Sequence, residues 1–121
     1  MSRRIIVCGG RDYVGNMPDF DRDMRPYRDA TIVHGACTTG LDKMAAWWCK
    51  ANAVKQEPHP ADWSDGKRAG PIRNQQMADA GAEACLAWPG GKGTLDMKRR
   101  ALAAGIRVIE MDADRRQKEL T

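Results

Sequence analysis

Three glycine-bearing segments of the sequence combine an adaptable main chain with charged or hydroxyl side chains. They read Gly9-Gly10-Arg11-Asp12, Gly35-Ala36-Cys37-Thr38-Thr39-Gly40 and Pro89-Gly90-Gly91-Lys92-Gly93-Thr94. Glycine adopts positive φ readily and lets an oxygen-rich ligand approach the main-chain amides. A helix that follows such a turn adds unpaired N–H groups and a partial positive charge, which suit a phosphate or a ribose. Tight turns also use glycine for structural reasons, but three such segments together favour a ligand-binding crevice.

Several side chains near these segments can add to the binding of an anion or a sugar. Arg11 and Lys92 can form charge-assisted hydrogen bonds, and the Thr94 hydroxyl can bond a phosphate or cap its own helix. Asp42 stands at a predicted helix start, where the helix dipole favours a carboxylate and where Thr39 to Asp42 fits a capping box. Arg73 and Asn74 either reach the crevice or are solvated. The candidate ligand-binding residues are Gly9, Gly10, Arg11, Asp12, Gly35, Ala36, Asp42, Arg73, Asn74, Gly90, Gly91, Lys92, Gly93 and Thr94.

Strands and helices alternate along the chain around these segments. Short apolar runs bounded by glycine or proline predict strands over residues 4–8, 31–34, 54–57, 84–88 and 106–109. Helices are predicted over residues 19–28, 41–51, 71–80 and 94–104, the last two ended by glycine. The tail over residues 112–121 is highly charged, and we expect a frayed or surface segment.

This alternation predicts an α/β fold: a Rossmann-like three-layer sandwich with a mostly parallel sheet of about five strands. Residues 1–111 then form a single domain. Such sheets bind ligands at the carboxyl ends of their strands, where connections diverge. The three glycine-bearing segments all follow a predicted strand, so the predicted crevice lies at that edge.

Composition and charge limit the class of protein. The 121 residues are 42% hydrophobic and 30% charged, without an apolar run long enough to cross a bilayer. No secretory signal is recognisable at the N-terminus, so we expect a cytoplasmic protein without a membrane partner. The net charge is +4 and the pI is near 9.0, but the basic residues are not gathered into one block of the sequence. Binding to nucleic acid is therefore possible but not favoured.

Cysteine, histidine and tryptophan offer few further signals. The four cysteines form no C-x-x-C pair and the two histidines lack metal-ligand spacing, so we expect neither a metal nor a cofactor. Cys8 and Cys85 fit strands as small buried hydrophobes. The adjacent Trp47 and Trp48 cannot share a helix face, so one is expected in the core and the other at a rim or subunit contact. Trp63 lies in a predicted polar loop, and we expect it either to pack over the sheet edge or to stack on a base.

The string from Pro89 to Thr94, with the upstream pair Arg73-Asn74, resembles the P-G-G-x-G-T signature and arginine of the SLOG superfamily. This superfamily includes the LOG phosphoribohydrolases and the Rossmann-like domain of DNA-processing A proteins. The sequence is most similar to the short YspA-like branch. The supporting segments run from the first strand to the fifth: Gly9-Gly10-Arg11-Asp12, His34-Gly35-Ala36, Gly40-Leu41-Asp42, Pro60-Ala61-Asp62-Trp63 and Gly70-Pro71-Ile72-Arg73-Asn74.

The resemblance implies a nucleotide-related ligand, but it breaks at the residue that LOG enzymes use for catalysis. These enzymes cleave the N-glycosidic bond of nucleoside 5′-monophosphates with a P-G-G-x-G-T-x-x-E motif, and Met97 stands at the glutamate position here. A thioether neither stabilises an oxocarbenium-like sugar nor activates water. The neighbouring Asp96 points about 100° away on a helix, and Asp42 or Asp12 are alternative carboxylates.

We therefore interpret the chain first as a module that binds or senses a nucleotide or a nucleotide-derived phosphorylated ligand. The alternative is a phosphoribohydrolase with Arg73, Asp42 and Asp96 as candidate catalytic residues. A second alternative, by analogy with DNA-processing A proteins, is a DNA-binding accessory protein. The resemblance also implies a homo-oligomer, because members of the superfamily commonly pair through helices.

Overall fold

Alternation along the central strand divides its side chains between two hydrophobic cores. In β1 (Arg3–Cys8), Ile5 and Val7 belong to one core, whereas Ile6 and Cys8 belong to the other. Successive side chains of a strand point to opposite faces of its sheet, so β1 is buried on both sides. Helices must therefore cover both faces.

The computed structural model describes residues 3–111 and the main chain of residues 117–120. Its other strands are β2 (Ala30–His34), β3 (Gln56–Pro58), β4 (Ala84–Ala87), β5 (Arg107–Met111) and β6 (Gln117–Leu120). The α-helices are α1 (Met17–Met24), α2 (Gly40–Ala51), α3 (Ala69–Asp79) and α4 (Lys92–Ala103), and short 3₁₀ segments occupy η1 (Arg25–Tyr27) and η2 (Trp63–Arg68).

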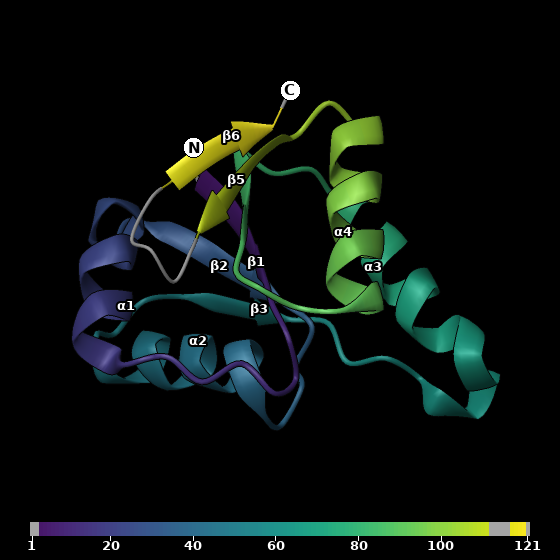
Figure 1. The fold of residues 1–121 in the computed structure, drawn as a ribbon, viewed down its shortest axis with the longest axis horizontal. Helices are drawn as coiled ribbons and strands as arrows, with labels where there is room; N and C mark the ends of the chain where they lie inside the picture. Colours follow the sequence, from purple (N-terminus) through teal and green to yellow (C-terminus); the bar gives the residue numbers. More distant parts are fainter. Residues whose placement is uncertain (1–2, 112–116, 121) are drawn as a thin grey trace.

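The helices form two layers on either side of the sheet (Figure 1). Phe20 of α1 and Trp48 of α2 belong to the core that contains Ile5 and Val7. Met77 of α3 and Met97 of α4 belong to the core on the opposite face. This arrangement confirms the predicted Rossmann-like three-layer sandwich. Trp48 is buried and Trp47 is 59% exposed, so the tryptophan pair is split as predicted.

The strand order β3-β2-β1-β4-β5-β6 places a change of direction at the centre of the sheet. From β1 the chain first builds outward to β2 and β3, and then returns to add β4 and β5 on the other side, all five strands being parallel. The helices that follow β1 and β4 lie on opposite faces. Connections that diverge in this way open a crevice beyond the carboxyl ends of the two strands.

An antiparallel edge strand that the sequence does not predict completes the sheet. Residues 117–120, expected to belong to a frayed or surface tail, pair with β5 as β6. An edge strand takes its stability from main-chain hydrogen bonds with one neighbour, so it needs no apolar run that would reveal it in the sequence. The remaining tail positions, 112–116 and 121, lie outside the described residues.

Several predicted element ends are wrong by a few residues. The first helix begins at Met17, where Asn16 accepts a hydrogen bond from the Asp19 amide, and gives way to the 3₁₀ segment before Pro26. Thr39 precedes α2 but its hydroxyl makes no capping bond, so the predicted capping box is wrong. Thr94 lies inside α4 and does not cap it.

Two other element ends also differ from the predicted ones. Helix α3 starts at Ala69, ahead of Pro71, and β3 extends to Pro58. Proline is tolerated in β3 because this strand is at the edge of the sheet. Within the described part of the chain, no helix has the length and apolar character to span a membrane.

Candidate functional site

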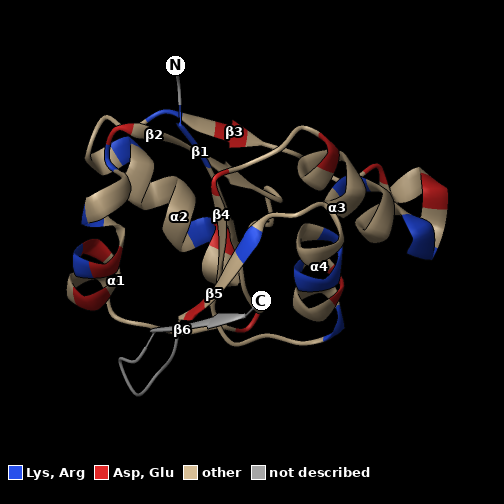
Figure 2. Cartoon of the chain, turned by 90° about the horizontal axis from the view of Figure 1, so that it is seen from above, with Lys and Arg blue, Asp and Glu red and all other residues tan. Residues whose placement is uncertain are grey.

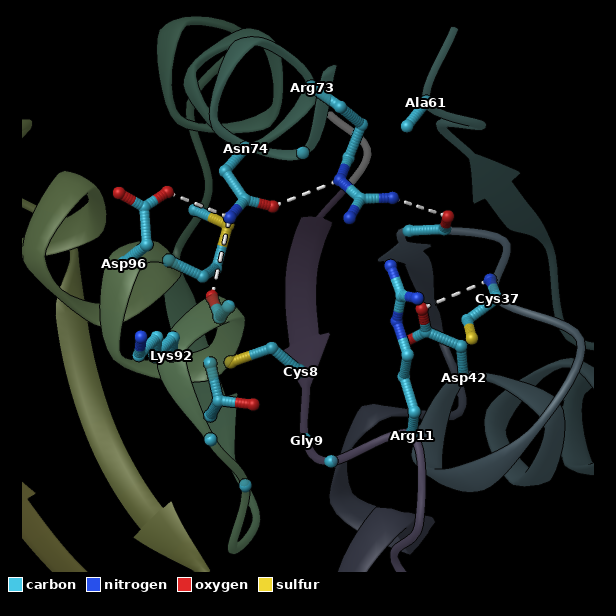
Figure 3. Close-up of a pocket in the computed structure, with 18 of the residues that line it drawn as sticks. Cys8, Gly9, Arg11, Cys37, Asp42, Ala61, Arg73, Asn74, Lys92 and Asp96 are labelled. Atoms are coloured by element: carbon cyan, nitrogen blue, oxygen red, sulfur yellow. Dashed lines mark hydrogen bonds between the residues drawn. The ribbon is translucent and has the colours of Figure 1, made fainter. Parts of the chain in front are cut away.

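All three glycine-bearing turns border one crevice of about 1510 Å³ at the carboxyl edge of the parallel strands. Every residue predicted for ligand binding lines it, and so does Asp96. Figure 3 shows Arg11 and Asp42 on one side of the β1 end, with Lys92, Asn74 and Asp96 on the other. Segments far apart in the sequence therefore contribute to a single site.

The first turn is joined to the other two by main-chain contacts. The Gly10 amide donates a hydrogen bond to the Pro89 carbonyl over 2.9 Å, and the Gly10 carbonyl accepts one from the Leu41 amide over 3.2 Å. A Cβ on Gly40 would lie 2.1 Å from the Gly10 oxygen, so the turns touch through bare main chain. The Gly10 amide is thus occupied within the protein, although the sequence predicts it as a bare donor for a ligand.

The second turn already holds an anion of the protein itself. The Cys37 amide donates a hydrogen bond to the Asp42 carboxylate over 3.2 Å. Burial raises the pKa of Asp42 above its usual value, and the Cys37 amide, His34 and Arg73 partly oppose this rise. A carboxylate in this position competes with a ligand phosphate for the turn. Asp42 is therefore better placed to accept hydrogen bonds from ligand hydroxyl groups than to admit an anion.

His34 supports the same turn from within the fold. Its Nδ1 accepts a hydrogen bond from the Ala36 amide over 3.0 Å, and its Nε2 pairs with Gln56 Oε1 over 2.8 Å. A ring with an acceptor Nδ1 carries its proton on Nε2, so the tautomer is set by the two neighbours. Ala36 has a φ of 58°, an uncommon conformation for a residue other than glycine. His34 thus has a structural role in the second turn.

Arg73 lies half-buried against the main chain of the second turn. Its Nη1 donates to the Gly35 carbonyl over 2.6 Å and to the His59 carbonyl over 3.2 Å, while its Nε donates to Asn74 Oδ1. A Cβ on Gly35 would stand 2.5 Å from Nη1, so the guanidinium needs glycine at that position. Burial lowers the pKa of Arg73, and the nearby Asp42 carboxylate opposes this change.

The side chain of Asn74, on α3, forms hydrogen bonds with residues of α4 that line the crevice. Its side-chain amide donates to Asp96 Oδ2 over 2.9 Å and to the Gly93 carbonyl over 3.3 Å. Arg100 also donates to Asp96 Oδ2. Although burial raises the pKa of Asp96, these hydrogen bonds lower it below its usual value. Asp96 is therefore held as a carboxylate by two protein donors, and Met97, at the glutamate position of LOG enzymes, is 1% exposed.

The third turn has a packed half and an open half. A Cβ on Gly90 would meet Thr94 Oγ1 at 2.1 Å, so Gly90 and the buried Thr94 pack directly on each other. Gly91 and Gly93 instead face open space. The Lys92 side chain between them lines the crevice and has no hydrogen bond or ion pair with any described residue.

The sequence also missed residues of the crevice wall. Lys67 and Arg99 line it. The place of Arg99 could have been predicted from the sequence, because positions 92, 96 and 99 follow helical spacing and therefore share one face of α4. Lys67 lies in a loop-like segment whose 3₁₀ geometry gives no such pattern. Among the described residues, no three histidine, cysteine or acidic side chains are arranged to hold a metal ion.

Removal of Arg73 should raise the pKa of Asp42 further, because the guanidinium is a nearby cation that favours the ionised carboxyl. An NMR titration of the side-chain carboxyl in the Arg73→Ala variant measures this shift. The Asp21 carboxyl, bound by Trp48 and Arg25, is the internal control and should titrate as in the parent protein. An unchanged or lower Asp42 pKa in the variant would contradict the electrostatic coupling.

Taken together, the fold and the crevice define a Rossmann-like α/β protein with a crevice at its topological switch point. The chain belongs to the YspA, cpYpsA-related SLOG family, whose model matches residues 3–66. It is also 38% identical over 120 residues to the Gene 61 protein of Mycobacterium phage D29, an alignment that covers 88% of this chain and 94% of that protein. No solved structure matches it significantly. The matched family segment contains the first two glycine-bearing turns of the crevice.

Proposed function

We propose that this protein binds a nucleotide or a nucleotide-derived phosphorylated ligand in the crevice, with phosphate at the open half of the third turn. The observation that carries the proposal is the presence of glycines that the protein's own structure does not require. Membership of the SLOG family is consistent with a nucleotide-related ligand.

Most glycines of the chain have a structural reason to lack a side chain. Some, such as Gly81 and Gly105, have positive φ, and others, such as Gly35 and Gly90, would bring a Cβ into collision. Three glycines have neither feature: Gly70, Gly91 and Gly93. All three line the crevice. Glycine is favoured where a ligand approaches the main chain closely, and a bound ligand explains all three positions at once.

The charges of the crevice suit an anionic ligand. Its basic lining residues are Arg11, Lys67, Arg73, Lys92 and Arg99, and its acidic ones are Asp12, Asp42 and Asp96. Asp42 and Asp96 accept hydrogen bonds from protein donors, which offsets part of their charge. Lys67, Lys92 and Arg99 have no ion-pair partner among the described residues. Lys92 is the first residue of α4, and an unpaired cation beside a helix N-terminus favours phosphate.

Replacement of Gly93 by alanine should weaken ligand binding by at least roughly 10-fold without loss of stability. The added methyl group meets no protein atom, and alanine is a better helix former than glycine. It would, however, occupy space at the proposed phosphate position. Isothermal calorimetry gives the affinity, and denaturant unfolding gives the stability.

Gly81→Ala is the matched control for this variant. Gly81 has a φ of 81° and lies outside the crevice, so its replacement should reduce stability and leave binding unchanged. The two variants together separate a binding role from a folding role. Equal ligand affinity in the parent protein and the Gly93→Ala variant would contradict the proposed position of the phosphate at the third turn.

The function itself is tested by calorimetry against nucleoside monophosphates and diphosphates, cyclic nucleotides, ribose 5-phosphate and inorganic phosphate. Binding of at least one of the nucleotides is expected, and no binding at millimolar concentration would overturn the proposal. Chromatography of the same mixtures detects free base, which would reveal phosphoribohydrolase activity. We expect no release, because Met97 is buried and Asp96 is engaged by Asn74 and Arg100.

Binding to DNA is less consistent with the distribution of charge. Figure 2 shows Lys and Arg on helices of both layers, with acidic residues interspersed, rather than in one continuous stripe. A duplex needs a row of cations that tracks its phosphates. A small anion needs only the few cations that line the crevice. The expected self-association of the chain stays a prediction, which light scattering would test.

A further inference from the structure

A tryptophan and an arginine from separate segments meet at the crevice. Arg11 follows β1, whereas Trp63 begins the 3₁₀ segment η2, and both line the crevice. The Arg11 guanidinium carbon lies 5.1 Å from the centroid of the Trp63 ring. In Figure 1, the teal η2 segment extends beyond α3, away from the body of the sheet. The contact therefore joins a projecting segment to the central strand connection.

The indole of Trp63 has little role in the hydrophobic cores. Its side chain belongs to neither core cluster, and the residue is 56% exposed. The backbone around it is held independently, because Asp62 accepts hydrogen bonds from the amide and hydroxyl of Ser64. The ring edge faces Gly70, where a Cβ would stand 3.9 Å from Cη2. Trp63 thus presents an accessible aromatic surface over one of the glycines that the fold does not require.

We infer that Trp63 is the base-recognition residue of the crevice and that the ligand carries a planar nucleobase, an inference that rests on the proposed function. Every nucleobase has an aromatic face that stacks on tryptophan. In the structure the Arg11 guanidinium lies over the indole in a cation–π contact, which is weak at an exposed position. A base takes that place, and Arg11 becomes available to the anionic part of the ligand.

The crevice lining offers partners to both the charged and the aromatic part of a nucleotide. The cations Arg11, Arg73 and Lys92 and the ring of Trp63 all line the crevice. Arg11 contacts Trp63, and Trp63 itself belongs to the projecting segment η2 (Figure 1). Asp42, already held by the Cys37 amide, remains an acceptor for ribose hydroxyl groups. Phosphate alone would use the cations without Trp63. A base-bearing ligand uses both regions.

The test compares ligands with and without a base on variants with and without the indole. Adenosine, guanosine, cytidine and uridine monophosphates are titrated calorimetrically beside ribose 5-phosphate. Trp63→Ala should weaken binding of the nucleotides by roughly 10- to 100-fold, as measured for loss of a stacking residue, and leave ribose 5-phosphate within about 2-fold. Trp63→Phe should restore most of the affinity.

Trp47→Ala is the matched control, because Trp47 is similarly exposed at 59% but lies outside the crevice lining. Its replacement should leave every affinity unchanged. In the Trp47→Phe background, nucleotide binding should also change the fluorescence of the remaining exposed tryptophan, while ribose 5-phosphate should have a smaller effect. Near-ultraviolet circular dichroism verifies that each variant keeps its packing.

The possible failures are distinguishable. Equal losses for nucleotides and ribose 5-phosphate in Trp63→Ala, or no loss for either, would overturn the role of Trp63 in base recognition and keep the proposed function. If ribose 5-phosphate binds and none of the nucleotides does, the role of Trp63 in base recognition is also overturned. No binding of any phosphorylated compound would instead overturn the proposed function.

Discussion

Replacing Gly40 by alanine is expected to lower the free energy of unfolding by about 3 kcal/mol or more. Gly40 has a φ of +64°, and alanine loses about 1–2 kcal/mol in that conformation. The new Cβ would also stand 2.1 Å from the Gly10 carbonyl oxygen and 2.6 Å from the Arg11 carbonyl carbon. These are main-chain atoms, which cannot move aside as the end of a flexible side chain would.

Gly81→Ala isolates the conformational part of this loss. Its φ of +81° is similar, but no atom lies within 4 Å of the added Cβ, so about 1 kcal/mol is expected. Urea unfolding of the two variants and the parent protein measures both values. The difference reports how rigidly the first two turns are pressed together. Equal losses for Gly40→Ala and Gly81→Ala would show that the turns can separate and that the crevice edge is adaptable.

The sequence predicted the layers of the fold because burial controls local composition. Strands such as β1 and β4 are covered on both faces, and each appears as a short apolar run that ends at glycine or proline. The helix ends were less predictable. Thr39 and Thr94 have suitable types for caps, but one hydroxyl makes no capping bond and the other packs under Gly90. Tertiary contacts decided the role of each hydroxyl.

The candidate site was predicted as a set of turns, but their different tasks were not. Adjacent carboxyl ends of parallel strands bring Gly10, Gly35 and Gly91 to one crevice, as the alternating pattern indicates. The sequence treats their amides as equivalent. In the structure, the Gly10 amide binds Pro89 and the second turn binds Asp42, which leaves the third turn open. Such pairings join positions about which local sequence carries no information.

Arg73→Ala is expected to weaken binding of a nucleoside phosphate by about 100-fold, in the range for loss of a charged hydrogen-bonding group from a sheltered site. Nη1 and Nε of Arg73 are held by Gly35, His59 and Asn74. These bonds fix the guanidinium before a ligand arrives, so its charge faces the crevice without a large loss of side-chain entropy. Arg73→Lys should recover only part of the affinity, because an ammonium cannot reproduce the three contacts.

Gly35→Ala provides an independent route to the same loss, because its methyl group would stand 2.5 Å from Nη1 and displace the guanidinium. Arg99→Ala is the control: this residue lines the same crevice but has no hydrogen bond to a described residue that would fix its position. Calorimetry should therefore show a loss of only a few-fold for Arg99→Ala. Similar losses at positions 73 and 99 would mean that net positive charge, rather than a pre-positioned guanidinium, holds the ligand.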